Sequence, residues 1–159
     1  MEVLSPSGAG NISGDVTMTG SITDGGSGVT GLKYIRGKQA SEPTLSSVWT
    51  DVEASSGTWK IDFSGANSIT SSHNIAQLGD VLPESGGKLY KVPVYFLTLD
   101  KVNNSHIIKK EFKVDPYGDI PEVTILSPAA DSVLGGTIRI AGTVSVPKPE
   151  IGKVGSMYI

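Results

Sequence analysis

The chain repeats part of itself, and this repeat limits its possible folds more than any other feature of the sequence. The tetrapeptide Val3-Leu4-Ser5-Pro6 returns as Ile125-Leu126-Ser127-Pro128, so that Leu4 and Leu126 are 122 positions apart. The same shift, without a gap, places Gly14 on Gly136 and Gly20 on Gly142. The apolar positions follow it too: Ile12 on Leu134, Val16 on Ile138, Met18 on Ile140 and Ile22 on Val144. A register kept over about twenty residues predicts a tandem array of one structural unit.

The repeat divides the 159 residues into one complete unit and the beginning of a second. We expect residues 1–118 to form the complete unit and residues 119–159 to form the N-terminal part of the next, incomplete one. The junction lies in residues 115–122, where Pro116, Gly118 and Pro121 interrupt the strand pattern. A strand at 137–146 would carry an apolar face without the rest of its core. We therefore expect that part to be disordered or to pair with an exposed strand edge.

Apolar and polar residues alternate with a period of two along most of the chain, which is typical of strands with one buried face. In the segment 58–63, Trp59, Ile61 and Phe63 fall on one face, and polar residues fall on the other. Strands are predicted at residues 16–22, 32–36, 58–63, 89–99 and 107–114, with a helical turn near 75–78. Turns rich in glycine, serine and asparagine separate them. The predicted fold class is therefore all-β, an antiparallel β-sandwich of two sheets.

Pro93 interrupts the longest predicted strand, at 89–99. Proline has no N–H to donate to a β-ladder, so we expect a bulge or an exposed edge at this residue. The alternation in this strand places four side chains on the core face: Tyr90, Val92, Val94 and Phe96.

The composition excludes several classes of protein. The sequence has no cysteine, so it can form no disulfide, thiolate metal ligand or thiol nucleophile. Its 13 basic and 16 acidic residues give a net charge of −3, whereas a nucleic-acid-binding protein normally has a basic face. No run approaches the roughly 18 apolar residues of a membrane-spanning helix. We expect neither nucleic-acid binding nor membrane insertion.

Several short motifs follow one another in a fixed order along the chain. They are Leu-Ser-Pro at 4–6, Gly14 and Gly20 around a strand, Asp24 with a glycine-rich turn and Gly28-Val29, Leu32 to Ile35, Trp49, Gly57-Thr58-Trp59, Phe63, and Gly87 to Val92 followed by Asp100 and Asn103-Asn104-Ser105. In this order the motifs resemble those of bacterial Ig-like domains. The last turn is similar to the Asp-x-x-Gly-Asn turn of that family. Asn103 stands where the family usually has glycine, and asparagine tolerates the positive φ of such a position. The resemblance covers almost the whole first unit and starts again at Ile125.

This resemblance implies an Ig-like sandwich that serves as a stalk or adhesion module of a secreted or surface-anchored bacterial protein. Its expected partners are neighbouring Ig-like repeats of the same chain, and its expected location is extracellular or at the cell surface. The unit is longer than a typical Ig-like domain, and the extra residues are concentrated at 69–87. An individual function would be sought in that insertion, because the fold alone does not specify one.

The sequence contains no pattern of catalytic residues. His73 and His106 are its only histidines, and neither lies in a nucleophile elbow or a His-x-x-x-His spacing. Paired carboxylates for glycoside hydrolysis would have to come from four residues, and no spacing singles out a pair. These residues are Asp51, Glu53, Asp62 and Glu84. We expect no enzymatic activity and no cofactor, and calcium is the one alternative considered.

Calcium is the metal that the acidic residues could hold, because it takes six to eight oxygen ligands. Asp115, Asp119 and Glu122 cluster in the junction, and Asp24 and Asp100 occupy turns that could meet at one end of the sandwich. The alternative is that Asp24 and Asp100 cap their own turns and that the junction residues are solvated. We favour this alternative, since the sequence has no Asp-x-Asp-x-Asp-Gly loop.

Four aromatic residues raise the question of carbohydrate binding, because sugars stack on exposed rings. Trp59 and Tyr90 fall on apolar faces and are predicted to be core. Trp49 follows a polar loop, and Tyr95 points away from Val94 and Phe96, so these two are the candidate ligand-binding residues.

These observations lead to one functional hypothesis and two alternatives. The first is a non-catalytic spacer in a tandem Ig-like protein that supports adhesion. The second is a module that binds a glycan or a host protein through the 69–87 insertion and the loops at one end. The third is an accessory domain of a large extracellular hydrolase.

Overall fold

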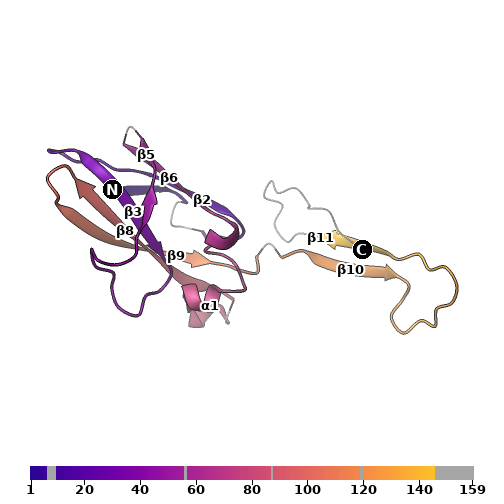
Figure 1. Ribbon diagram of the computed structural model, residues 1–159. Helices are drawn as coiled ribbons and strands as arrows, with labels where there is room; N and C mark the ends of the chain where they lie inside the picture. Colours follow the sequence, from indigo (N-terminus) through magenta and orange to yellow (C-terminus); the bar gives the residue numbers. More distant parts are fainter. Residues whose placement is uncertain (7–9, 56, 87, 119, 146–159) are drawn as a thin grey trace. The chain divides into compact units, whose positions relative to one another are not determined.

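The computed structural model describes residues 1–6, 10–55, 57–86, 88–118 and 120–145. The chain divides into two compact units, Met1–Tyr117 and Gly118–Ile159. Among the described residues, the first unit contains two antiparallel sheets and the second unit contains one sheet of two strands (Figure 1). The prediction of an all-β fold is confirmed.

The first unit is a sandwich of two sheets. The first sheet has the strand order β1-β2-β6-β5, and the second contains β4-β3-β8 in that order. β9 pairs with one edge of β8, and the other edge of β8 pairs with β3 and, nearer the start of β8, with β7. The strands of the first sheet are β1 (Glu2–Ser5), β2 (Val16–Ser21), β5 (Ala54–Ser55) and β6 (Thr58–Phe63). Those of the second are β3 (Val29–Arg36), β4 (Thr50–Val52), β7 (Asp80–Val81), β8 (Tyr90–Asp100) and β9 (Ser105–Val114). The strands predicted in this unit are all present.

The core lies between the two sheets and follows the predicted alternation. In β6, Trp59, Ile61 and Phe63 are buried, and the polar residues between them are exposed. Aromatic rings join the sheets: Phe63 meets Tyr34 of β3 edge to face at 5.5 Å between ring centroids, and Trp59 lies 5.4 Å from Phe96 of β8. Such pairs add a specific geometry to the apolar area that they bury.

Between β1 and β2 the chain crosses from the first sheet to the edge of the second. The Ile12 N–H donates to the Lys113 carbonyl at 2.8 Å, and the Asp115 N–H donates to the Ile12 carbonyl at 2.8 Å. These bonds make a parallel bridge between Ile12 and Val114. Ile12, which is buried in the core, therefore links the chain before β2 to β9 at the edge of the second sheet.

The insertion at 69–87 packs against the sandwich. It contains α1 (Ile75–Leu78), β7 and the 3-10 helix η2 (Pro83–Ser85); a further 3-10 helix, η1 (Gly65–Asn67), precedes it. Ile69 and Ile75 are buried in the same core as the strands, and the helical turn predicted at 75–78 is confirmed. Gly79 lies so close to β8 that a Cβ atom there would be 2.8 Å from the Lys91 carbonyl oxygen. The described part of the insertion thus contributes to the core of the fold.

The prediction for Pro93 was wrong. β8 is the central strand of its sheet, and its pairing with β9 continues through Pro93 opposite Glu111 without a bulge. The Pro93 carbonyl accepts the N–H of Gly37 at 2.8 Å, just after the end of β3, and the nitrogen of a strand residue faces the same side as its carbonyl. The proline nitrogen therefore faces the interval between β3 and β7, where no ladder bond is needed.

The second unit contains one hairpin, β10 (Glu122–Ser127) and β11 (Ala141–Ser145), in its described part. Its pairing follows that of β1 and β2 at the shift of 122. Val3 faces Gly20 and Ser5 faces Thr19, while Ile125 faces Gly142 and Ser127 faces Ala141, with an irregularity at the same step in both hairpins. The glycines also correspond: Gly14 has a φ of 66° and Gly136 a φ of 72°.

The strand predicted at 137–146 is shorter than expected. β11 starts at Ala141, and Val146 lies outside the described residues. In the first unit, Val16, Thr17 and Met18 of β2 pair with β6 alone, because β1 reaches only from Thr19 to Ser21. The corresponding residues 138–140 have no such partner in the described part of the second unit, so no ladder holds them extended.

Candidate functional site

Two turns at one end of the first unit come together, as the calcium hypothesis required for Asp24 and Asp100. The Ser27 hydroxyl lies between them, 3.2 Å from Oδ2 of Asp24 and 3.0 Å from Oδ2 of Asp100. The Gly28 N–H also donates to Oδ2 of Asp24. The two carboxylates are therefore joined through a hydroxyl of the intervening turn.

Both carboxylate oxygens of Asp100 already accept hydrogen bonds from neighbouring groups. Oδ1 accepts the N–H groups of Val102 at 2.9 Å and Asn104 at 2.7 Å, and Oδ2 accepts the Asn104 side-chain amide at 2.7 Å in addition to Ser27. Burial acts to raise the pKa of Asp100, but the hydrogen bonds from Asn104, Ser27 and Val102 together lower it. Asn103, at the tip of this turn, has a φ of 65°. The geometry is that of a carboxylate that caps its own turn.

The remaining calcium candidates lie in the junction segment 115–122, at and beyond the end of the first unit. Oδ1 of Asp115 accepts the N–H of Tyr117 at 3.1 Å, and Glu122 is exposed at the start of β10 in the second unit. Asp119 lies outside the described residues. Within the ranges that the structure describes, no group of three or more aspartate, glutamate or histidine side chains is placed to hold a metal ion.

The prediction that Tyr95 is exposed was wrong: 6% of its surface is accessible. Its side chain lies on the sheet face opposite the core, but β8 is a central strand, and Ile35 of β3 and Lys109 of β9 flank the ring on either side. The Lys109 ammonium is 5.9 Å from the ring centroid. Trp49, just before β4, is half-buried and donates its Nε1 hydrogen to the Thr44 carbonyl at 2.9 Å. The two residues form no exposed aromatic pair.

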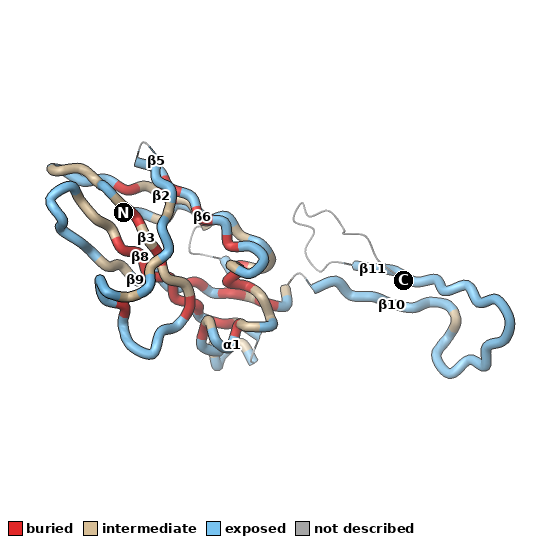
Figure 2. The backbone as a smooth tube through the Cα atoms, viewed as in Figure 1, coloured by how far each residue is buried: buried red, intermediate tan, exposed pale blue. Residues whose placement is uncertain are grey.

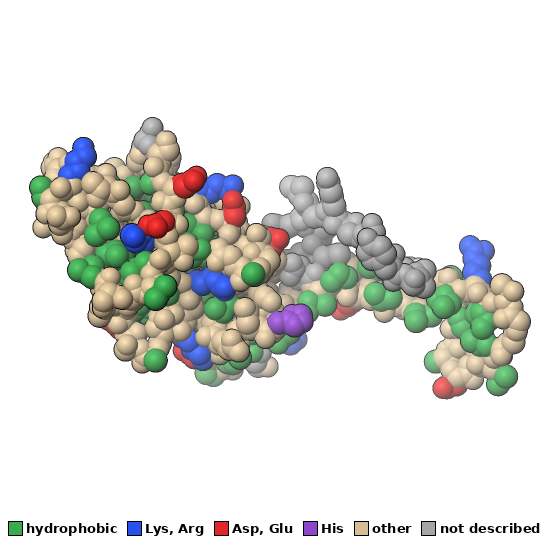
Figure 3. Space-filling view, in the orientation of Figure 1, with side chains coloured by type: hydrophobic (Ala, Val, Ile, Leu, Met, Phe, Trp, Pro, Cys, Tyr) green, Lys and Arg blue, Asp and Glu red, His purple; other side chains and the backbone are tan. Residues whose placement is uncertain are grey.

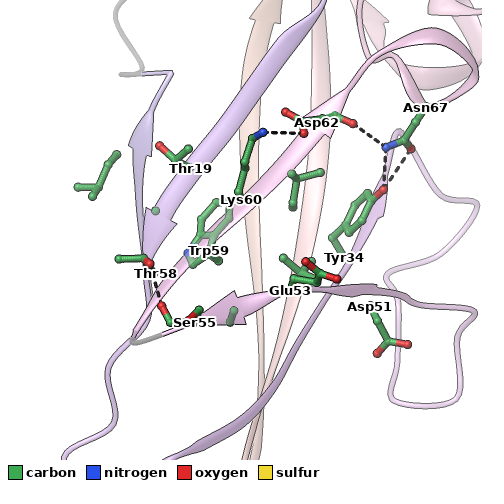
Figure 4. Close-up of a pocket in the computed structure, with 15 residues that line it drawn as sticks. Thr19, Tyr34, Asp51, Glu53, Ser55, Thr58, Trp59, Lys60, Asp62 and Asn67 are labelled. Atoms are coloured by element: carbon green, nitrogen blue, oxygen red, sulfur yellow. Dashed lines mark hydrogen bonds and ion pairs between the residues drawn. The ribbon is translucent and has the colours of Figure 1, made fainter.

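A cleft of about 1060 Å³ opens along the edge of the sandwich where the chain passes from β4 in the second sheet to β5 in the first (Figure 4). Three of the four carboxylates considered for glycoside hydrolysis line it: Asp51, Glu53 and Asp62. The spacing of these three residues in the sequence did not predict that they share a cleft. They do so because the chain crosses from one sheet to the other after β4, which brings Asp51 and Glu53 close to Asp62 of β6.

Asp62 is held by two side chains on the first sheet. The Thr17 hydroxyl donates to Oδ1 at 2.6 Å, and the Lys60 ammonium is 2.9 Å from Oδ2. The hydrogen bond from Thr17, followed by that from Lys60, lowers the pKa of Asp62. A general acid in glycoside hydrolysis needs a raised pKa, so Asp62 is unsuited to that role.

Tyr34, Asn67 and Trp59 also line the cleft, and Tyr34 and Trp59 are buried whereas Asn67 is half-buried. The Tyr34 hydroxyl and the Asn67 side chain exchange hydrogen bonds at 2.9 and 3.1 Å, and the Asn67 amide also reaches the Asp62 carbonyl at 3.1 Å. The buried Nε1 of Trp59 has no acceptor among the described residues. The chemistry presented is that of a polar surface with carboxylates, hydroxyls and an amide.

The chain matches no protein-family model, no curated protein and no solved structure. No helix among the described residues is long and apolar enough to cross a membrane. The two histidines, His73 and His106, are both exposed and lie apart from the cleft lining.

Proposed function

We propose that the chain is a non-catalytic spacer of tandem Ig-like repeats in a secreted or surface-anchored bacterial protein, where it supports adhesion. The observation that carries the proposal is the correspondence between the β1–β2 and β10–β11 hairpins, which share their register and the position of a positive-φ glycine at a shift of 122. The same local structure at a constant interval is what stacked units require.

The first unit has the properties of a stiff element. Its two sheets enclose one continuous core, and its end turns are tied together by Asp100, Ser27 and Asn104. The segment that follows it contains Pro116 and Pro121, which favour an extended, semi-rigid connection. In such an array the number of units sets the reach of the protein.

Small-angle scattering of chains with one, two and three copies of residues 1–122 tests this function. A semi-rigid spacer predicts that the maximum dimension increases by a constant amount with each copy. The matched control replaces residues 115–122 by a glycine and serine linker of equal length, for which the increase should approach the square-root dependence of a flexible chain. A square-root dependence in the unaltered chains would contradict the proposal.

The cleft between β4 and β6 favours a second candidate, a glycan-binding module. Its carboxylates and hydroxyls could bond sugar hydroxyls, although the burial of Tyr95 removes the aromatic platform expected from sequence. A glycan array with the full chain tests it, with the Glu53→Gln variant as a probe of the cleft. Binding that this variant reduces would support the candidate, and a flat array would exclude it.

A further inference from the structure

The β10–β11 hairpin has an exposed apolar face that carries Val123, Ile125 and Val144, and Ile138 and Ile140, just before β11, are exposed as well. The accessible fractions of these five side chains lie between 40% and 64%. Figure 2 shows this hairpin as exposed along nearly its whole length, and Figure 3 shows hydrophobic side chains uncovered on it. In the described part of the second unit, β11 pairs with β10 alone.

In the first unit the corresponding face packs against the second sheet across the core, and β6 lies beside β2 in the same sheet. Met18, the counterpart of Ile140, has no accessible surface, whereas Ile140 is 64% accessible. Met18 lies opposite Ile61 of β6, and Phe63 of the same strand lies opposite Val16. The strand β6 therefore supplies both a hydrogen-bonded neighbour for β2 and large apolar side chains beside it.

The length of β11 agrees with the lack of such a neighbour. β2 includes Val16, Thr17 and Met18, which pair with β6 and not with β1. Their counterparts 138–140 are not in a strand. A strand that paired with this edge of β11 could thus extend the ladder by three residues, 138–140.

A positive charge just before β11 favours an acidic residue in a strand that pairs with this edge. In the first unit Thr17 lies opposite Asp62 and donates a hydrogen bond to it at 2.6 Å. The counterpart of Thr17 is Arg139, which forms no ion pair with any described residue. An acidic side chain at the Asp62 position of an incoming strand would face Arg139 directly, and opposite charges in such cross-strand pairs are stabilising.

We propose that the free edge of β11 binds an antiparallel strand with the chemistry of β6. That strand carries large apolar residues opposite Ile138, Ile140 and Gly142, and an acidic residue opposite Arg139. Gly142 leaves room for a tryptophan, as Gly20 does beside Trp59 in the first unit. This is β-strand addition, in which main-chain hydrogen bonds give affinity and alternate side chains give specificity.

The test uses the full chain and a fluorescently labelled peptide of residues 57–65, Gly-Thr-Trp-Lys-Ile-Asp-Phe-Ser-Gly. Fluorescence anisotropy should show saturable binding, and amide exchange should show new protection at residues 138–140. A peptide with Ile61→Asp should bind at least about tenfold more weakly, since a charge would be placed against the apolar face.

Charge reversal locates the site. The Arg139→Glu chain should bind the peptide about 2- to 5-fold more weakly, and a peptide with Asp62→Lys should recover that loss. The Lys101→Glu chain, altered at an exposed residue of the first unit, is the matched control and should bind as the unaltered chain does. Equal affinity of the Arg139→Glu chain and the unaltered chain, or no saturable binding up to roughly 1 mM peptide, would overturn the proposal. The second result would mean that another segment or a second copy of the chain covers this edge.

The inference rests on the repeated unit of the proposed function, but the two can fail separately. Peptide binding without a constant increase in length per copy would refute the spacer and leave the strand-binding edge. A constant increase without peptide binding would do the reverse.

Discussion

Gly20 lies directly opposite Trp59 across β2 and β6, and the indole ring covers the glycine. A Cβ atom at position 20 would clash with Cζ2 of Trp59 and, more closely still, with the Glu2 carbonyl oxygen. No side chain larger than hydrogen fits between β1 and the ring. The absence of a side chain at this position is therefore what allows the tryptophan to lie across the first sheet.

Gly20→Ala should destabilise the first unit by about 2 kcal/mol or more, because either the backbone or the ring must move. Gly25→Ala is the matched control, since a Cβ atom there meets nothing within 4 Å, and its effect should stay within about 0.5 kcal/mol. Chemical denaturation monitored by circular dichroism measures both. Equal stability of the two variants would show that the sheet adapts without cost.

Asn103 should accept glycine more readily than a β-branched residue. Its φ of 65° is in the left-handed region, so Asn103→Gly should be neutral or slightly stabilising, whereas Asn103→Val should cost about 1–2 kcal/mol. The same denaturation experiment compares the pair. A valine variant as stable as the glycine variant would contradict the turn geometry.

Asp100 should make the stability of the first unit sensitive to acid. Its pKa is lower in the folded chain than in the unfolded chain, where an ordinary aspartate has a value of about 3.9. The stabilisation is therefore present above that pH and is lost as the pH falls through the lower folded pKa. Asp100→Asn should reduce the loss of melting temperature between about pH 5 and pH 2. An identical acid profile in the variant would assign the sensitivity to other carboxylates.

The two tryptophans should differ in fluorescence. Trp59 is buried in the core and Trp49 is half-buried before β4. In the Trp49→Phe variant the remaining emission should be blue-shifted and resistant to acrylamide, whereas Trp59→Phe should leave the more readily quenched residue. Circular dichroism checks that each variant is folded. Equal quenching in two folded variants would refute the assigned burial.

Calcium should have little effect on this chain. Asp24 and Asp100 already accept hydrogen bonds from the turns around them, so an ion would have to displace these donors. We expect no heat of binding in isothermal titration and an unchanged melting temperature after chelation. A clear rise in melting temperature with added calcium would reverse this interpretation.

Local alternation predicted the inner face of the sandwich well. Trp59, Ile61 and Phe63 needed only the period of their own strand, because one face of β6 packs against the core. The burial of Tyr95 could not be predicted in this way, since it depends on Ile35 of β3 and Lys109 of β9, which lie directly opposite Tyr95 on the two neighbouring strands.

The sites also depended on long-range structure. Ser27 contacts Asp24 three positions before it and Asp100 73 positions after it, and no local pattern shows the second contact. Asp51 and Asp62 reach one cleft only because the chain changes sheets between them. The sequence identified these residues as candidates, but their grouping was a property of the topology.

The pairing of β2 with β6 has a consequence for synthesis on the ribosome. β2 ends at Ser21, yet its partner is complete only at Phe63, so an emerging chain presents a β1–β2 hairpin with one bare edge until β6 has been made. Neighbouring nascent chains could pair through such an edge, which is a known route to aggregation. In the interval between translating Met18 and Ile61, this edge of β2 is thus open to such pairing.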